Sequence, residues 1–252
     1  MKPVIAVGLV LGMAIAPAAA ADMPPYSKAP TPVFNWTGFY VGGDIGIAST
    51  TNNAEWDPAP LLGVMQASGG TGGASFAAGG FGGYNWQFAR SWVAGVEADW
   101  TGMKAGTSVT EPWLSIAGVV PGGFTTLTSE LDWTASVRAR FGYLIVPSFL
   151  AYATAGVAWG NMRYSANSSS AAIGYTTTAA VSNTETGWVA GFGFEWAPFA
   201  ASGLLLRAEY LNYGFGGAQV VSTANAFPAF PSGYSWSSPN VSLGRIAASY
   251  KF

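Results

Sequence analysis

The chain has 252 residues, of which 9% are charged, 15% are aromatic and 34 are glycine. Soluble domains typically carry about 25% charged residues, so this composition leaves too little polar surface for an ordinary soluble domain, and its glycine content argues against a helical one. The formal net charge of −2 gives no electrostatic basis for nucleic-acid binding, and the absence of cysteine excludes disulfides and thiol chemistry.

The first 21 residues are organised as a secretory signal peptide. Lys2 gives a positively charged N-terminal region, residues 4–16 are apolar, and Ala19-Ala20-Ala21 forms an A-x-A cleavage site. We therefore expect cleavage after Ala21. Residues 22–35 contain four prolines, which cannot donate to a β-ladder, and are expected to form an extended periplasmic lead-in. No later run of about 20 apolar residues exists, which excludes transmembrane helices.

Strict alternation of apolar and polar residues marks the segment Leu131–Tyr143. The parity that begins with Leu131 carries large aromatic residues, and the other parity carries Asp132, Arg138 and Arg140. A period of two is typical of a β-strand. Aromatic residues near both ends, with small or aliphatic residues between them, suit a strand whose apolar face meets lipid. The pattern therefore predicts a transmembrane strand whose charges face the interior of a barrel.

Similar segments recur along the chain and give eight predicted strands. In chain order they are Trp36–Ala48, Ala74–Phe88, Trp92–Trp100, Leu131–Tyr143, Phe149–Arg163, Thr184–Trp196, Leu204–Tyr213 and Asn240–Phe252. Small residues blur the parity of the fifth segment, so its two faces remain unassigned. In the others the parity that carries charge is expected to face inward.

The connections between these segments alternate in length. Long polar loops are predicted after the first, third, fifth and seventh strands, at residues 50–73, 101–130, 164–183 and 214–239. Short turns follow the second, fourth and sixth strands. Bacterial outer-membrane barrels have even strand numbers, short periplasmic turns and long external loops. We therefore predict an all-β fold over residues 36–252: one eight-stranded antiparallel up-and-down barrel with both termini in the periplasm.

Ten charged residues are predicted to point into the barrel. They are Asp44, Glu97, Asp99, Asp132, Arg138, Arg140, Glu195, Arg207, Glu209 and Arg245. Counting along the strands places four pairs at similar depth: Glu97 with Arg138, Glu195 with Arg207, Glu209 with Arg245, and Arg245 with Asp44 across the closing seam. Eight strands leave an interior just wide enough for side chains, and buried charges need partners. We expect a paired ionic plug rather than an open channel, so that Arg138→Ala should reduce stability more than it alters permeability.

Catalysis has little support in the sequence. The chain has no histidine and no cysteine, which excludes a Ser-His-Asp triad and a cysteine nucleophile. Glu97 and Asp99 share one strand face and are the one candidate acid–base pair, but structural charges in the lumen are the simpler interpretation. We predict no catalytic residue, no metal ligand and no cofactor.

Several strings together resemble one family. They are WTGFYVGG from Trp36, GYNWQ from Gly83, GVEADW from Gly95, VRARFGY from Val137, YATAGVA from Tyr152, GWVAGFGFE from Gly187, RAEY from Arg207 and the closing YKF. The chain resembles the small outer-membrane β-barrels of Gram-negative bacteria, the opacity-type and immunogenic surface proteins related to OmpA-like barrels. Members are described as structural envelope proteins, surface antigens, adhesins, minor porins and, in some cases, haem binders. The lack of histidine counts against the usual axial haem ligation.

The resemblance implies a structural, surface-exposed protein of the outer membrane that supports envelope integrity and presents its external loops. Expected partners are outer-membrane lipid, the barrel assembly machinery through the C-terminal Tyr250 and Phe252, and an external ligand or host surface through the loops. The alternatives are a narrow porin-like channel for small polar solutes, an outer-membrane enzyme that modifies lipid, and a soluble lipocalin-like carrier. The sequence leaves the oligomeric state open.

Overall fold

A computed structural model of the chain describes residues 34–57, 67–115, 118–199, 201–223, 231–237 and 239–252. The predicted cleavage site at Ala21 and most of the predicted lead-in lie outside these residues. Among the described residues we find no helix that is both long and apolar enough to cross a membrane.

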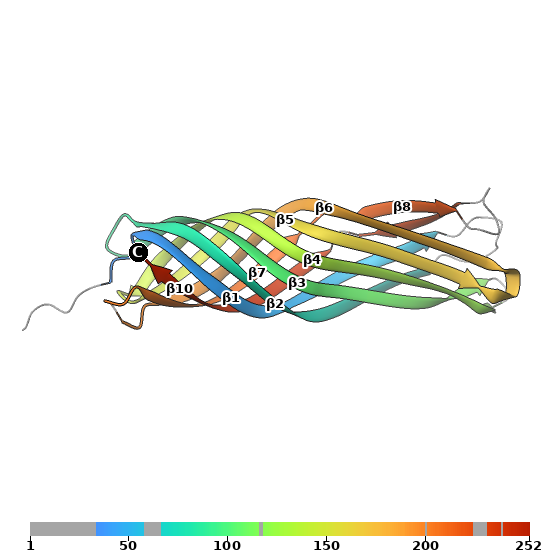
Figure 1. The fold of residues 1–252 in the computed structure, drawn as a ribbon, viewed down its shortest axis with the longest axis horizontal. Helices are drawn as coiled ribbons and strands as arrows, with labels where there is room; N and C mark the ends of the chain where they lie inside the picture. Colours follow the sequence, from blue (N-terminus) through green and yellow to red (C-terminus); the bar gives the residue numbers. More distant parts are fainter. Residues whose placement is uncertain (1–33, 58–66, 116–117, 200, 224–230, 238) are drawn as a thin grey trace, which may run out of the picture. The chain divides into compact units, whose positions relative to one another are not determined.

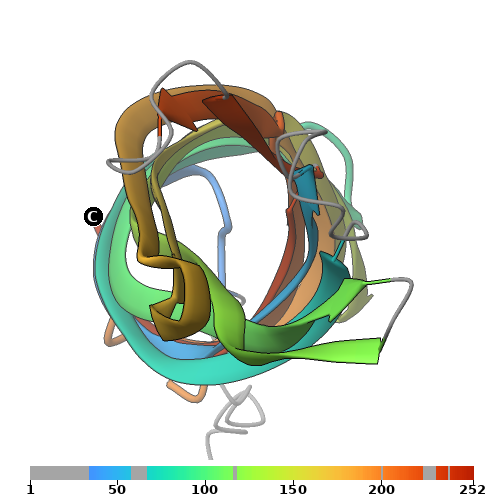
Figure 2. The ribbon, with the colours of Figure 1, turned by 90° about the vertical axis from the view of Figure 1, so that its right-hand side faces the viewer.

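Eight β-strands close into a ring (Figure 1). The ring strands are β1 (Gly38–Asp57), β2 (Ala67–Gln87), β3 (Trp92–Ser115), β4 (Gly118–Val146), β5 (Phe149–Ser170), β6 (Tyr175–Trp196), β7 (Leu204–Gly214) and β10 (Asn240–Lys251). Each is antiparallel to its neighbours, and β10 pairs with β1 to close the ring. Figure 2 looks into the ring from the end that carries the long hairpins. The predicted eight-stranded antiparallel barrel is confirmed.

Two short strands extend the ring at one end. β8 (Ala218–Thr223) and β9 (Pro231–Trp236) form a hairpin, and β9 pairs with residues 54–57 of β1. β9 thus continues the wall where β10 begins. A 3-10 turn, η2 (Ala171–Ile173), connects β5 to β6 at this same end. We call it the long-hairpin end, and the opposite end, which holds the C-terminus and the turn between β2 and β3, the short-turn end.

The two faces of the ring have opposite chemistry. Large apolar side chains are exposed on the outside, for example Phe39 at 67%, Ile246 at 61% and Phe192 at 55%, whereas Arg138 on the inside is only 1% exposed. A continuous exposed apolar surface is stable where it meets lipid rather than water. Arg138, Arg207 and Glu209 are buried, as the alternation predicts for a membrane barrel.

The predicted boundaries are wrong for all four long connections, since the connection at residues 214–239 contains β8 and β9. Much of residues 50–73, 101–130 and 164–183 is strand, because β1 runs on to Asp57, β3 to Ser115 and β5 to Ser170. In these extensions large apolar residues such as Trp113 and Leu127 point inward, together with some hydroxyl side chains such as Ser168, whereas polar residues such as Ser108 and Thr110 point outward. A strand whose outward residues are polar lacks the apolar parity of a lipid-facing strand, so its sequence pattern resembles that of a loop.

A β-bulge at Asp132 corrects two further expectations. The β4–β5 register jumps from Leu131↔Met162 to Trp133↔Asn161, so Asp132 has no partner on β5. The extra residue reverses the parity of β4, and Leu131, predicted to face lipid, is buried inside. Asp132, predicted to face the lumen, points outward instead, 3.4 Å from Nη2 of Arg163.

The structure also assigns the faces of β5. Leu150, Tyr152 and Thr154 are buried, whereas Ala153 and Ala155 are exposed. The inward glycines of this region have a steric cause: a Cβ on Gly156 would lie 2.0 Å from the carbonyl oxygen of Val137. Alanine and glycine on both faces explain why the sequence pattern is weak there.

Candidate functional site

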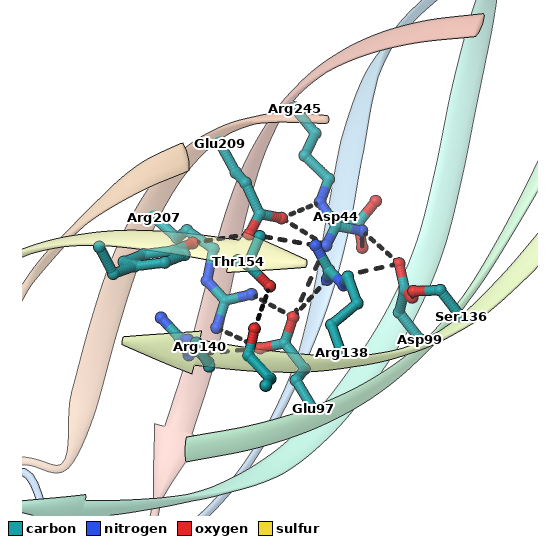
Figure 3. Close-up of polar contacts among 12 residues, drawn as sticks. Asp44, Glu97, Asp99, Ser136, Arg138, Arg140, Thr154, Arg207, Glu209 and Arg245 are labelled. Atoms are coloured by element: carbon teal, nitrogen blue, oxygen red, sulfur yellow. Dashed lines mark hydrogen bonds and ion pairs between the residues drawn. The ribbon is translucent and has the colours of Figure 1, made fainter. Parts of the chain in front are cut away.

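Nine charged side chains from six ring strands meet inside the barrel; Figure 3 shows how those other than Glu195 point toward one another. This lumen cluster consists of Asp44 on β1, Glu97 and Asp99 on β3, Arg138 and Arg140 on β4, Glu195 on β6, Arg207 and Glu209 on β7, and Arg245 on β10. None of these side chains is more than 3% exposed. Five carboxylates therefore share four guanidinium groups in a site closed to solvent.

Four ion pairs within the cluster join residues that the strand count placed together. Glu97 lies 2.5 Å from Arg138, Glu195 lies 2.5 Å from Arg207, and Glu209 lies 2.5 Å from Arg245. Each of these three pairs consists of direct cross-strand partners. The fourth pair, Arg245 with Asp44 at 3.2 Å, spans the seam between β10 and β1. Asp132 is the one predicted member that lies elsewhere.

Glu97 is the hub of the cluster. Its carboxylate oxygens lie within 4.0 Å of all four guanidinium groups: 2.5 Å from Arg138, 3.3 Å from Arg140, 2.7 Å from Arg207 and 3.8 Å from Arg245. In the ring order, β3 and β7 are separated by three strands on either side. The contact from Glu97 to Arg207 therefore crosses the full width of the barrel. Little free lumen remains at this level.

Sequence reasoning missed the aromatic members of the site. The hydroxyl of Tyr40 donates to Oε2 of Glu97 and accepts from Nη1 of Arg140, both at 2.8 Å, and the hydroxyl of Tyr152 donates to Glu209 at 2.8 Å. The guanidinium carbon of Arg140 lies 3.9 Å from the ring centre of Tyr152, and that of Arg207 lies 4.1 Å from the ring centre of Phe81. Tyr40 lies on the same parity of β1 as Asp44, and this pattern could have predicted that its side chain points into the lumen.

Hydrogen bonds link the remaining carboxylates into the same network. Arg245 Nη1 donates to Asp99 at 3.0 Å, and the hydroxyl of Ser136 also donates to Asp99. Arg140 Nη2 lies 3.1 Å from Glu195. Glu97 and Asp99, the candidate acid–base pair, are thus both engaged by arginines. In the part of the chain that the structure describes, no group of three or more acidic residues is placed to hold a metal ion.

Apolar side chains cover the cluster at the short-turn end. Phe34, Trp36, Leu150 and Leu205 belong to one buried group there. The indole of Trp36 donates to the carbonyl oxygen of Pro147 at 3.0 Å, which ties the segment before β1 to the turn between β4 and β5. The described end of the predicted lead-in therefore packs into the barrel opening.

A larger apolar core fills the barrel at the long-hairpin end. Trp56 and Trp113 stack with ring centres 5.0 Å apart and are fully buried. Beside them Tyr234 donates to Ser168 at 3.1 Å, and burial raises the pKa of the Tyr234 phenol to about 12. The lumen thus contains three successive layers: an apolar seal, the ionic cluster and an aromatic core.

A lipid-facing outer wall around a buried ionic interior defines a transmembrane β-barrel. Residues 6–252 match the family model for the outer membrane protein beta-barrel domain, and the chain belongs to this family.

Two curated relatives are similar over much of the chain. The 31 kDa outer-membrane immunogenic protein of Brucella melitensis is 30% identical over 231 residues, which cover 90% of this chain and 88% of the relative. The 22 kDa outer membrane protein of Rhizobium leguminosarum is 32% identical over 181 residues, which cover 71% of this chain and 64% of the relative. Among solved structures, the outer membrane protease OmpT of Escherichia coli has a TM-score of 0.50 at 8% identity, covering 90% of this chain and 99% of that chain. This last likeness shows the fold alone.

The protein is accordingly a surface-exposed barrel of the outer membrane, as the sequence predicted. In bacterial barrels the short turns face the periplasm, so the long-hairpin end is the external end. Tyr250 and Phe252 lie at the short-turn end with their rings exposed, 5.2 Å apart.

Proposed function

We propose that the protein is a non-conducting structural barrel that supports the outer membrane and displays its long hairpins to the outside. The observation that carries this proposal is the contact from Glu97 to Arg207, which spans the lumen inside a cluster closed to solvent. A solute would have to break several buried ion pairs to pass. The apolar layers on both sides of the cluster would also have to open.

Conductance in a planar bilayer tests the proposal. We expect the reconstituted barrel to give no reproducible steps above background. Arg138→Ala should lower the thermal stability while adding little conductance, because the neighbouring charges and aromatic rings still fill the lumen. Regular wild-type steps, or a large rise in conductance in Arg138→Ala without loss of stability, would support the narrow porin-like channel instead.

We also infer that the barrel is not an enzyme. Glu97 and Asp99 are buried, and each contacts at least two arginines, which leaves neither poised to exchange a proton with a substrate. The test is to measure lipid turnover by the purified protein. Turnover that is lost in a folded Glu97→Gln or Asp99→Asn variant would contradict this inference.

The C-terminal residues are proposed to serve assembly. Tyr250 and Phe252 place two exposed aromatic rings at the end of the last strand, where an assembly machine can recognise the chain before the ring closes. A Phe252→Ala variant that assembles in cells as fast as the wild type would contradict this role.

Cysteine labelling on intact cells tests which end is outside. The chain has no cysteine, so Ala172→Cys at the β5–β6 tip and Ser202→Cys at the β6–β7 turn each introduce one thiol; both positions are exposed. A membrane-impermeant maleimide should label Ala172→Cys on intact cells and Ser202→Cys only after the outer membrane is permeabilised. The reverse pattern would contradict the assigned orientation.

A further inference from the structure

We propose that the outer face of β3, β4 and β5 binds a phosphorylated glycolipid of the external leaflet, with Lys104 and Arg163 as the residues that hold its headgroup phosphate. The inference rests on the outer-membrane location and on the orientation of the barrel, and is independent of whether the lumen conducts.

The bulge at Asp132 brings the two cations to one place. Lys104 lies in the irregular step between Gly102↔Trp133 and Ala105↔Leu131, and therefore sits beside Asp132 on the neighbouring strand. On the other side of β4, Arg163 is the cross-strand partner of Glu130. Nη2 of Arg163 lies 3.4 Å from Asp132, and its side chain is 57% exposed. A guanidinium has five N–H donors, so this contact leaves donors for a phosphate.

The distribution of basic residues singles out this position. Among the described residues, Arg138, Arg140, Arg207 and Arg245 point into the lumen, and Arg90 and Lys251 lie at the short-turn end. Lys104 and Arg163 are the other two, and both flank the same bulge. Within the described external half of the wall, the outward basic residues thus both lie on one three-strand face, beside the carboxylates of Glu130 and Asp132.

Tryptophans set the depth of the two cations in the membrane. Trp100 and Trp159 are exposed on β3 and β5, and Trp133 is partly exposed on β4 between them. Such rings mark the membrane–water interface. Lys104 and Arg163 each follow a tryptophan by four residues toward the external end, which for a tilted strand is about 10 Å along the membrane normal. This is the level of lipid headgroups.

Beyond the cations the same wall is rich in hydroxyl groups. Ser108 bonds Thr128 at 3.0 Å and Thr110 bonds Thr126 at 2.8 Å on the exposed face of β3 and β4, and Asn167 is exposed on β5. From the membrane outward, the face therefore presents an apolar surface, an aromatic one, a charged one in which Lys104 and Arg163 lie beside acidic residues, and a hydroxyl-bearing one. A lipid whose phosphorylated headgroup carries sugars outward matches all four layers, whereas a phospholipid has no partner for the last.

Binding to purified lipid tests the proposal. The full-length barrel in detergent is titrated with a rough, bis-phosphorylated lipopolysaccharide, with its enzymatically dephosphorylated form, and with phosphatidylglycerol, and bound lipid is counted by native mass spectrometry. The wild type should prefer the bis-phosphorylated glycolipid. The double variant Lys104→Gln/Arg163→Gln should bind it at least about tenfold more weakly, because charge-assisted hydrogen bonds to phosphate are lost.

The control is Arg90→Gln/Lys251→Gln, which removes the same charge at the short-turn end and should bind like the wild type. Heat-modifiable mobility on gels verifies that both double variants remain folded. Equal binding of the two glycolipid forms, unchanged binding by Lys104→Gln/Arg163→Gln, or an equal preference for phosphatidylglycerol would overturn the proposal. None of these outcomes would alter the conductance result, so the two proposals can fail separately.

Discussion

Replacing Glu97 with glutamine is expected to destabilise the barrel more than any other single change of charge. The substitution keeps the shape of the side chain but leaves Arg138, Arg140 and Arg207 facing an uncharged group in a buried site. Removing one partner of a buried ion pair typically costs about 3–5 kcal/mol. Each of these arginines keeps a second carboxylate, Glu209 or Glu195, but all three lose a buried contact at once. Urea unfolding in detergent, followed by tryptophan fluorescence, measures the loss.

Asp132→Asn is the matched control for Glu97→Gln. It also converts an acid paired with an arginine into an amide, but its partner Arg163 is 57% exposed and Asp132 itself is 30% exposed. Exposed pairs contribute about 0–1 kcal/mol, so the stability should barely change. A similar loss in both variants would mean that the burial of the lumen cluster has no energetic consequence.

Gly156→Ala is expected to have the second-largest effect. It should lower the free energy of unfolding by about 3 kcal/mol or prevent assembly of the barrel. A Cβ at this inward position would lie 2.0 Å from the carbonyl oxygen of Val137 and 2.7 Å from the Cα of Arg138. Both contacts are with backbone, which cannot rotate away, so β4 and β5 must separate. Overpacking of this kind typically costs about 1–3 kcal/mol and occasionally more. Heat-modifiable mobility after refolding, and urea unfolding of the folded fraction, provide the readout.

Gly43→Ala serves as its control on the lipid-facing side. There the nearest atom to a new Cβ is the carbonyl oxygen of Gly79 at 3.6 Å, an ordinary contact. The added methyl group faces outward, so folding and stability should match the wild type. If Gly156→Ala refolded as well as Gly43→Ala, the steric reason for glycine inside β5 would be wrong.

The membrane-spanning part of the fold could be predicted because lipid imposes a simple alternation. Glu195 and Arg207 fall opposite each other because antiparallel register and the short turn between β6 and β7 determine their positions. Counting from the strand ends at the short-turn end likewise places Glu97 opposite Arg138 and Glu209 opposite Arg245. Aromatic partners such as Tyr152 were not predictable, since small residues hide the parity of β5.

The external extensions were missed for a different reason. Outside the membrane the outer wall meets water, so the rule that assigns apolar residues to the outside no longer applies. The bulge at Asp132 marks this change on β4, and a single extra residue cannot be recognised from alternation alone. One irregular step therefore accounts for the errors at both Leu131 and Asp132.

The bond between Arg245 and Asp44 has a consequence for the order of biogenesis. These residues belong to the last and first ring strands, and Arg245 also contacts Asp99 and Glu209. An open sheet would keep Arg245 paired with Glu209 on the adjacent strand but would separate Asp44 from Arg245. The Asp44 carboxylate would then lie unpaired beside hydrocarbon, an arrangement that the bilayer strongly disfavours. Neutralisation of Asp44 is thus coupled to the pairing of β10 with β1. Closing the ring therefore lowers the free energy of a partially inserted barrel, which favours its completion.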